Sequence, residues 1–180
     1  ETEEDIREFL AADLSKVSDG SELTDMEKGV SIIQDAIAAG KHIRIIGDYD
    51  VDGVTSTYIL YKGLIGLHAK CDKFIPHRIK DGYGLHENAI RRAREDGVEV
   101  ILTCDNGIAA ADAVSLAKEF GMTVVVTDHH EVPFVQEPDG RRYILPAADA
   151  VIDPKRPEDH VFKEICGAVV AWKFTGRLYK

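Results

Sequence analysis

The sequence predicts an α/β fold in which a mostly parallel β-sheet is flanked by helices on both faces. Short apolar segments alternate along the chain with segments of helical periodicity. Several apolar segments are unbroken, which is typical of strands buried on both faces. The chain has 180 residues, 44% of them hydrophobic, which is enough for one domain with a buried core.

The elements of the N-terminal half follow from periodicity and from their end signals. The first 20 residues are expected to form a peripheral helix, so we separate residues 1–22 from a main domain at 23–180. Residues 24–40 predict a helix with Thr24 and Glu27 as a capping box and a closing glycine. Three elements follow, which are an apolar strand at 42–47, a helix at 54–67 and a strand at 71–76 that ends at a proline.

The C-terminal half repeats this alternation. Amphipathic spacing predicts helices at residues 86–97 and 109–121, and unbroken apolar runs predict strands at 98–104 and 122–127. Residues 131–150 contain three prolines and are expected to be irregular. A short strand at 150–153 and a helix from about residue 163 complete the predicted domain.

Composition limits the possible classes of protein. The net charge of −10 argues against a large nucleic-acid footprint, which normally requires a basic face, although acids that bind cations would account for part of the charge. No apolar run is long enough to span a membrane, and no secretion leader precedes the first helix. The scattered Cys71, Cys104 and Cys166 form no CxxC pair, which favours reduced thiols in a cytoplasmic protein. The absence of a starting Met suggests a trimmed chain.

Polar clusters follow four of the predicted strands. They are the segment from Asp48 to Gly53 in "GDYDVDG", Asp105 in "DNGI", the run "DHH" at Asp128 to His130, and "DPK" at Asp153 to Lys155. In an open parallel sheet, ligands bind beyond the carboxyl ends of the strands, so these clusters are expected to meet at one edge. Packed carboxylates repel one another and are costly to bury unpaired, and a divalent cation would relieve both costs.

The ligand types favour a site with two metal ions. Asp50 and Asp52, two apart in an extended segment, are expected to project to the same side and to hold different ions. Asp105 on a neighbouring strand is placed to bridge both ions, and His129 adds a nitrogen donor. This mixed set favours Mn²⁺, with Mg²⁺ also possible. Two ions about 3.5–4 Å apart are typical of phosphoester hydrolysis. A calcium loop is disfavoured, since Ile59 occupies its twelfth position.

Four ordered segments resemble motifs of the DHH phosphoesterase superfamily, and within it the RecJ-type single-stranded-DNA exonucleases. These segments are "GDYDVDGVTST", "CDNGI", "VVVTDHHEVP" and "AVIDPKRPED", and "IPHRIKDGYGL" and "ICGAVVAWKF" add to the match. The resemblance extends from about Ile45 to Lys173. It implies a DHH-type domain at residues 23–180 and a metal-dependent 5′-to-3′ exonuclease that acts on single-stranded DNA in repair and recombination.

The resemblance also implies roles for individual residues. It implies metal ligands at Asp50, Asp52, Asp105 and His129, and supporting catalytic positions at Asp48, Asp128 and His130. Asp128 is expected to orient a histidine through a carboxylate–imidazole hydrogen bond.

The sequence departs from the family pattern in three respects. Ile46 stands where some relatives have a histidine ligand, and Asp153 replaces the usual asparagine of an Asn-Pro-Lys motif. The last aspartate ligand of the family, and the second catalytic-core domain, lie beyond residue 180. We therefore expect an N-terminal fragment of a longer enzyme, with weak activity by itself.

Four residues are candidates for nucleic-acid binding. Lys155 and Arg156 would neutralise a DNA phosphate, or else be solvated. Arg78 would receive the strand and Tyr83 would stack on a base, although Tyr83 between two glycines would fit equally well in the core. The expected partner is single-stranded DNA, with a helicase or a single-strand-binding protein added only by analogy, and nothing in the sequence requires more than a monomer.

Other functions remain open at this point. An oligoribonuclease or a cyclic-dinucleotide phosphodiesterase of the same superfamily would share the metal chemistry. An aspartyl-phosphate phosphatase is a second alternative, because "DVDGVT" resembles its nucleophile motif, but that mechanism does not need "DHH". A replication scaffold that has lost catalysis is a third alternative, which the retained acidic clusters disfavour.

Overall fold

The main sheet of the protein is parallel, as the sequence predicts. The computed structural model describes residues 2–11, 13, 17–77 and 84–180. Five strands pair in parallel in the order β2-β1-β3-β4-β7. Their bounds are β1 Ile43–Ile46, β2 Cys71–Phe74, β3 Val100–Cys104, β4 Thr123–Thr127 and β7 Ala150–Ile152.

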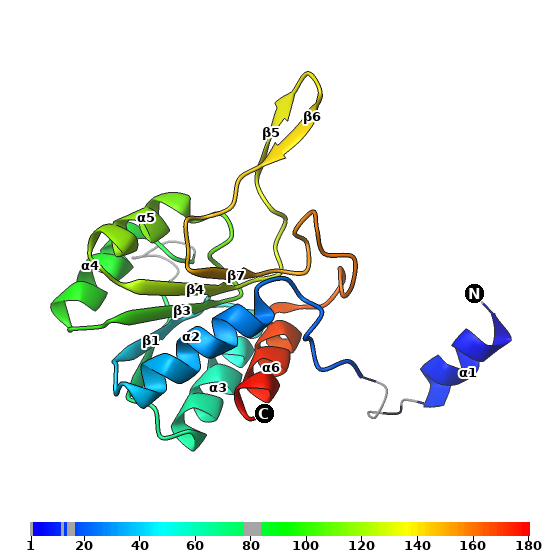
Figure 1. Ribbon diagram of the computed structural model, residues 1–180, viewed down its shortest axis with the longest axis horizontal. Coiled ribbons are helices and arrows are strands. Elements are labelled where there is room, and N and C mark those ends of the chain that lie inside the picture. The colour runs from blue at the N-terminus through cyan, green and yellow to red at the C-terminus, as the bar shows by residue number, and fades with distance from the viewer. Residues whose placement is uncertain (1, 12, 14–16, 78–83) are drawn as a thin grey trace.

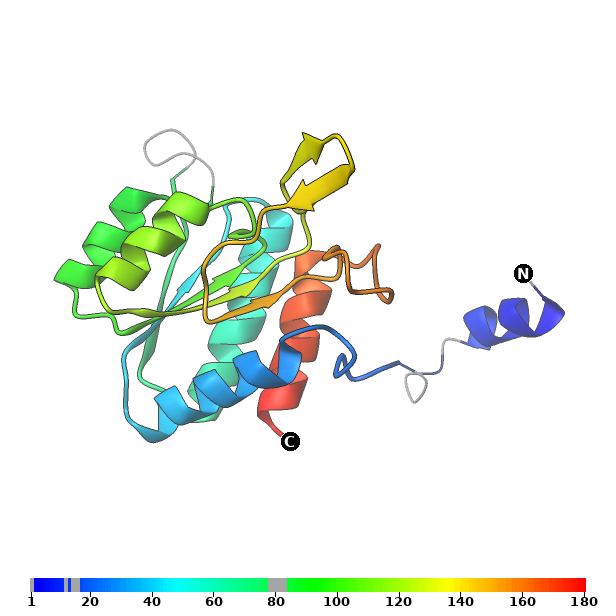
Figure 2. The same cartoon turned by 45° about the horizontal axis from the view of Figure 1, so that its top comes forward.

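Helices cover both faces of this sheet (Figures 1 and 2). One face carries α2 (Met26–Ala38), α3 (Val51–Gly66) and α6 (Gly167–Leu178), and the other carries α4 (Glu87–Glu95) and α5 (Ala111–Glu119). The apolar residues of β1 and of β3 are divided between the two hydrophobic cores, since strand side chains alternate between faces. This burial on both faces explains why the two strands are mostly apolar, with Arg44 and Thr103 as the exceptions.

A β-hairpin occupies part of the segment that the sequence predicts to be irregular, so that prediction is wrong there. Strands β5 (Phe134–Glu137) and β6 (Gly140–Tyr143) pair antiparallel and project from the body of the domain (Figure 1). The turn uses Pro138 and Asp139, followed by Gly140 at φ +147°, a conformation that residues with a side chain rarely adopt.

Two helix starts also differ from the predictions. The capping box of α2 is wrong, because Asp25 is the N-cap, with φ 60° and no side-chain capping bond. Thr24 instead donates its hydroxyl and its backbone N–H to Asp159 Oδ1, at 2.8 and 2.9 Å. Helix α3 begins at Val51, inside the acidic motif, rather than at residue 54.

The N-terminal helix α1 (Glu3–Ala11) lies apart from the sheet in both views (Figures 1 and 2). The segment that follows it is held against α6. Lys173 Nζ donates to the carbonyl of Ser18 at 2.6 Å, and Arg177 Nη1 lies 2.7 Å from Asp19 Oδ2. Among the described residues, no helix is both long and apolar enough to cross a membrane.

Candidate metal centre

Acidic side chains from four strands gather at the carboxyl edge of the sheet. Asp48 follows β1, Asp105 follows β3, Asp128 follows β4 and Asp153 follows β7, and all four are at most 2% exposed. The parallel order of the strands brings these positions together, as the sequence predicts.

The turn from β1 into α3 does not have the predicted geometry. Asp50 is the N-cap of α3, and its Oδ1 accepts the N–H of Gly53 at 2.9 Å. Asp52 lies in the first helical turn, where its two oxygens accept the N–H groups of Gly167 and Ala168 at 2.7 and 2.8 Å. The expectation that Asp50 and Asp52 project to the same side of an extended segment is therefore wrong, because Asp52 lies in a helix. The carboxylate of Asp52 joins α3 to the positive N-terminal end of α6.

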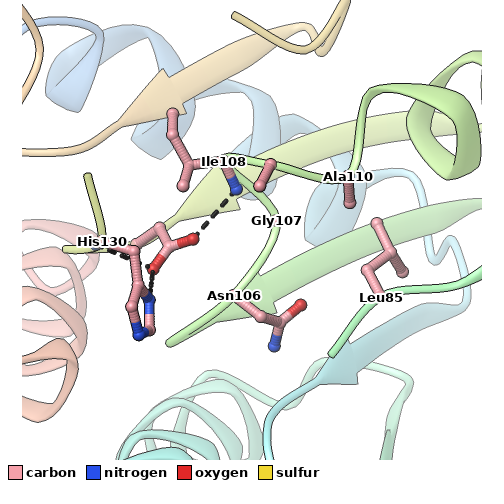
Figure 3. A pocket seen from close by; sticks show the side chains of 8 residues that line it. Leu85, Asn106, Gly107, Ile108, Ala110 and His130 are labelled. Atoms are coloured by element: carbon pink, nitrogen blue, oxygen red, sulfur yellow. Dashed lines mark hydrogen bonds and ion pairs between the residues drawn. The ribbon is translucent and has the colours of Figure 1, made fainter. Parts of the chain in front are cut away.

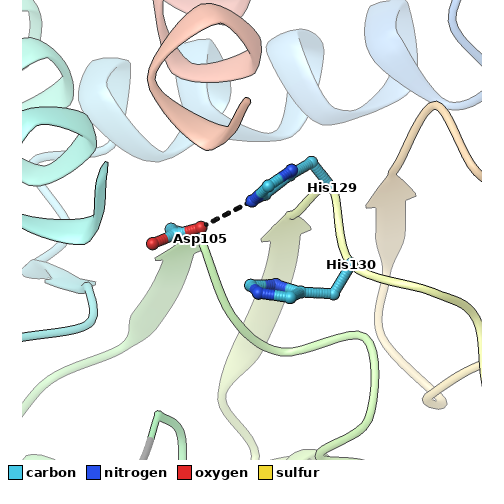
Figure 4. A group of neighbouring side chains, drawn as sticks. All are labelled: Asp105, His129 and His130. Atoms are coloured by element: carbon cyan, nitrogen blue, oxygen red, sulfur yellow. Dashed lines mark ion pairs between the residues drawn. The ribbon is translucent and has the colours of Figure 1, made fainter. Parts of the chain in front are cut away.

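Two groups of ligand atoms at this edge are close enough to hold metal ions. One group consists of Asp48, Asp50 and Asp105, and the other of Asp105, His129 and His130. Within each group the ligand atoms lie within 4.8 Å of one another. Figure 4 shows Asp105 at the end of β3 facing the two histidines that follow β4. Because Asp105 belongs to both groups, the arrangement suits two neighbouring cations that share one carboxylate.

His129 contacts two of the predicted ligands. Its Nε2 lies 3.0 Å from Asp105 Oδ1 and 3.3 Å from Asp52 Oδ2. The bond to Asp105 raises the pKa of His129. Burial raises the pKa of Asp105 to about 6, against the lowering effect of His129, and the charges of Asp52 and Asp50 raise it further. In this arrangement a nitrogen that can bind a metal ion lies where carboxylates converge.

The backbone around Asp105 is specialised for this convergence. Asp105 has φ 59°, in the left-handed region that aspartate tolerates better than most residues. A Cβ added to Gly167 would lie 2.9 Å from both Cβ and Oδ1 of Asp105. Only a residue without a side chain therefore lets the N-terminus of α6 approach this carboxylate so closely.

Several buried aspartates in the described residues have an oxygen without a hydrogen-bond partner, among them Asp48 and Asp153 at this edge. Asp48 Oδ1 and Asp153 Oδ2 have no hydrogen-bond partner in the part of the chain that the structure describes. Burial raises the pKa of Asp48, and it raises the pKa of Asp153 to about 7. Unsatisfied buried oxygens are costly, so this edge of the sheet is short of donors or positive charge. The oxygen-rich set with imidazole nitrogen fits the coordination chemistry of Mn²⁺ or Mg²⁺.

Asp128 holds the histidine pair in place. Its Oδ1 lies 2.8 Å from His130 Nδ1 and accepts the N–H of His129 at 2.7 Å, while its Oδ2 accepts the N–H of Ile108 at 2.9 Å. Figure 3 shows the bonds to His130 and Ile108. The bond to Asp128 raises the pKa of His130 to about 9. The expected carboxylate–imidazole pair is thus present, and the histidine in it is His130.

A cavity of about 250 Å³ opens beside His130 (Figure 3). Its wall is mostly apolar and is formed by Leu85, Asn106, Gly107, Ile108, Ala109, Ala110, Asp128 and His130. Asn106, a residue to which the sequence assigned no role, donates Nδ2 to the carbonyls of Ile46 and Cys104 at 3.0 and 2.8 Å. These bonds connect the ends of β1 and β3. The position of Asn106 in the motif "CDNGI" is the sequence signal that could have identified it.

The residues predicted to bind nucleic acid occupy different environments in the structure. Lys155 Nζ lies 3.0 Å from Glu131 Oε1 at the rim of the site. Arg156 is 8% exposed and hydrogen-bonds Asp25, Glu158 and the carbonyl of Val151. We correct the expectation for Arg156, because these bonds give its guanidinium a structural role. Arg78 and Tyr83 lie outside the described residues.

Comparison with known families now identifies the domain. Residues 42–180 match the family model described as "DHH family, N-terminal domain". The chain belongs to the DHH family. The segments that supply Asp48, Asp105, Asp128 and Asp153 all fall inside the matched DHH region.

Curated relatives of this DHH domain include nucleases. A Bacillus subtilis (strain 168) protein named single-stranded-DNA-specific exonuclease RecJ is 40% identical over 179 residues, which cover 99% of this chain and 22% of the relative. A protein of the same name from Escherichia coli (strain K12) is 36% identical over 153 residues, which cover 84% of this chain and 25% of the relative. The chain therefore spans about a quarter or less of the length of these relatives.

Solved structures agree with this relationship. A structure titled "Crystal structure of exonuclease RecJ bound to manganese" aligns with a TM-score of 0.74 at 32% identity, over 87% of this chain and 38% of that one. A Thermus thermophilus RecJ in complex with Mn²⁺ aligns with a TM-score of 0.67 at 30% identity, over 87% of this chain and 21% of that one. The DHH domain described here thus has the fold of these two proteins.

Proposed function

We propose that this DHH domain is the metal-binding part of a phosphodiesterase that degrades single-stranded DNA from its 5′ end, in repair and recombination. The observation that carries the proposal is the pair of ligand groups that share Asp105. The relatives named as single-stranded-DNA-specific exonucleases support the substrate. The 5′-to-3′ direction comes from the family resemblance of the motifs.

The metal-binding part of the proposal involves two Mn²⁺ or Mg²⁺ ions. Of the predicted ligands, Asp50, Asp105 and His129 would hold them. Asp48, predicted as a supporting residue, joins them because it belongs to a ligand group, whereas Asp52 belongs to neither group and lies beside His129. The unsatisfied oxygen of Asp48 supports this fit. Bound divalent ions would supply activation of water and stabilisation of charge on the phosphoryl oxygens.

The remaining residues of the site orient and receive the substrate. Asp128 fixes the ring of His130 through Nδ1, and the side chain of His130 is 44% exposed beside the cavity. We assign His130 a hydrogen bond to a phosphate oxygen. Lys155 at the rim would attract the DNA backbone, with Arg78 and Tyr83 retained as predicted contacts. A nuclease restricted to single strands depends on strand separation, so the expected partner is a helicase or a single-strand-binding protein. The enzyme itself is proposed to be a cytoplasmic monomer.

The test is cleavage by the full-length protein with Mn²⁺, on four substrates in parallel. The substrates are a 5′-phosphorylated single strand labelled at either end, its duplex, a dinucleotide and a cyclic dinucleotide. We expect mononucleotides to be released from the 5′ end of the single strand, little cleavage of the duplex, and loss of activity in EDTA. Preference for either dinucleotide would contradict the substrate assignment, and activity that survives EDTA would contradict the metal mechanism.

A further inference from the structure

The β5–β6 hairpin projects from the body of the domain (Figures 1 and 2). Phe134 is 45% exposed, Val135 is 41% exposed and Tyr143 is 38% exposed. A two-stranded ribbon alone is marginally stable in water, and large exposed side chains often mark a binding surface. The candidate metal centre makes no use of this hairpin.

One face of the hairpin combines aromatic rings with an unneutralised cation. The register places Phe134 opposite Tyr143 and Gln136 opposite Arg141, so these four side chains share what we call the aromatic face. The two rings have centroids 6.0 Å apart, and the Arg141 guanidinium lies 4.3 Å from the centroid of the Phe134 ring. Among the described residues, Arg141 has no carboxylate partner.

The opposite face lacks these properties. It presents Val135, Glu137 and Arg142, and the Nε of Arg142 lies 2.6 Å from Glu137 Oε1. The positive charge on this side is therefore neutralised within the hairpin, and no ring accompanies it. The two faces differ in charge and in aromatic content on the same short ribbon, which provides an internal control.

The hairpin begins close to the candidate metal centre. Phe134 follows His130 by four residues, a stretch of chain that spans at most about 14 Å when fully extended. The base of the ribbon is closed by a bond of 2.7 Å from the N–H of Ile144 to the carbonyl of Pro133. A flexible polymer with one phosphate at His130 would therefore have its neighbouring units within reach of the aromatic face.

We propose that the aromatic face binds bases of single-stranded nucleic acid next to the scissile phosphate. This inference rests on the proposed function and adds a binding surface to it. Rings such as Phe134 and Tyr143 stack on bases whatever the sequence, and a guanidinium over a ring both stacks and attracts phosphate. A cation without a carboxylate partner suits a polyanion. A protein partner would not require that cation.

The test is binding of a fluorescent 20-nucleotide single strand, followed by anisotropy in EDTA so that cleavage does not interfere. We expect Phe134→Ala to weaken binding about tenfold, as for the loss of one stacking ring. Val135→Ala, one position along on the opposite face, is the matched control and should change the affinity less than twofold.

Two further variants separate stacking from folding. Phe134→Tyr keeps a ring and should retain wild-type affinity. Arg141→Gln should lower the slope of log affinity against log salt by about 0.7, the value for one phosphate contact on a single strand. Equal affinities for Phe134→Ala and Val135→Ala would overturn the proposal, and so would a hairpin that captures a protein while leaving DNA affinity unchanged.

The outcome is separable from that of the proposed function. A protein that binds the strand through Phe134 but does not cleave it with Mn²⁺ would contradict the proposed function and support the hairpin assignment. Metal-dependent cleavage by a protein whose affinity for the single strand does not depend on Phe134, Tyr143 and Arg141 would support the proposed function and contradict the hairpin assignment.

Discussion

The acids at the carboxyl edge of the sheet and the acids around Arg44 differ in how their charge is balanced. Arg44, in β1, has its guanidinium 2.7 Å from both oxygens of Asp72 and 2.8 Å from Asp96 Oδ2. His42 adds a contact of 3.0 Å to Asp72. Burial favours the neutral form of Asp72, but Arg44 and His42 outweigh it and hold the pKa of this carboxyl below its ordinary value.

At the carboxyl edge the balance is reversed. The pKa values of Asp48, Asp105 and Asp153 are raised, mainly by burial, and within the described part of the chain no lysine or arginine side chain pairs with these three carboxylates. The comparison shows that the partly exposed acids Asp72 and Asp96 have a cation within the chain, which is Arg44. Where the chain supplies none, the acids form a place for an external cation.

The largest effect is expected from Asp105→Asn, which removes the carboxylate shared by both ligand groups. Charge stabilisation by bound metal contributes several kcal/mol, so we expect a loss of about a thousandfold in kcat/KM on single-stranded DNA. Steady-state cleavage by the full-length protein measures it. Asp96→Asn, in the Arg44 cluster, is the control and should retain activity. Equal activities of the two variants would refute the distinction between the clusters.

A smaller loss is expected from Asp128→Asn. Asparagine would keep the size of the side chain but weaken the bonds to His130 Nδ1 and to the backbone of Ile108 and His129. Partners that orient histidines in metal sites are worth about 10- to 100-fold in affinity or activity. Because Asp128 also holds the backbone N–H of His129, a proposed metal ligand, we expect such a loss in Mn²⁺ affinity, measured by calorimetry at a temperature where the metal-free variant is folded. A wild-type affinity would show that this pair has no orienting role.

The Arg44 cluster should affect folding and leave activity intact. Arg44→Met keeps much of the apolar stem but leaves Asp72 and Asp96 without their cation. We expect the free energy of unfolding to fall by about 2 kcal/mol, less than for a fully buried pair, because the Asp72 side chain is 37% exposed. Urea denaturation measures it. Arg91→Met, which breaks an exposed pair with Glu87, should cost less than about 0.5 kcal/mol.

The smallest effect concerns acid pH. The pKa of Asp72 is lower in the folded protein than its ordinary value, so its contribution is complete above the ordinary value near 3.9 and is lost as the pH falls through the folded value. We expect the free energy of unfolding to fall by less than about 1 kcal/mol from this group as pH decreases from 5 to 3. Asp72→Asn should show a shallower fall over the same range, and an identical slope would exclude this contribution.

The sheet and the meeting of the acids could be predicted from the sequence. Unbroken runs such as β3 and β4 require burial on both faces, and parallel strands must end at one edge. The family motifs then placed Asp105 and His129 together. These inferences rely on local periodicity and topology, which a sequence records directly.

Other features depended on tertiary contacts. The N-terminus of α6 binds Asp52, and one partner of Arg156 is Asp25, 131 residues away. No local sequence pattern indicates either of these two contacts. The hairpin does have a local signal, because the turn sequence Pro138-Asp139-Gly140 lies between two short segments that contain aromatic residues.

The most direct test of the central claim is thermal unfolding of the 180-residue chain during a Mn²⁺ titration, with Asp105→Asn and Asp96→Asn in parallel. A ligand that binds the folded state raises the melting temperature by an amount that grows with its affinity and concentration. We predict that Mn²⁺ raises the melting temperature of the wild type and of Asp96→Asn, and leaves Asp105→Asn unchanged. A wild type that does not respond to Mn²⁺, or a response that Asp105→Asn retains in full, would contradict the claim that the unbalanced acids form a metal site.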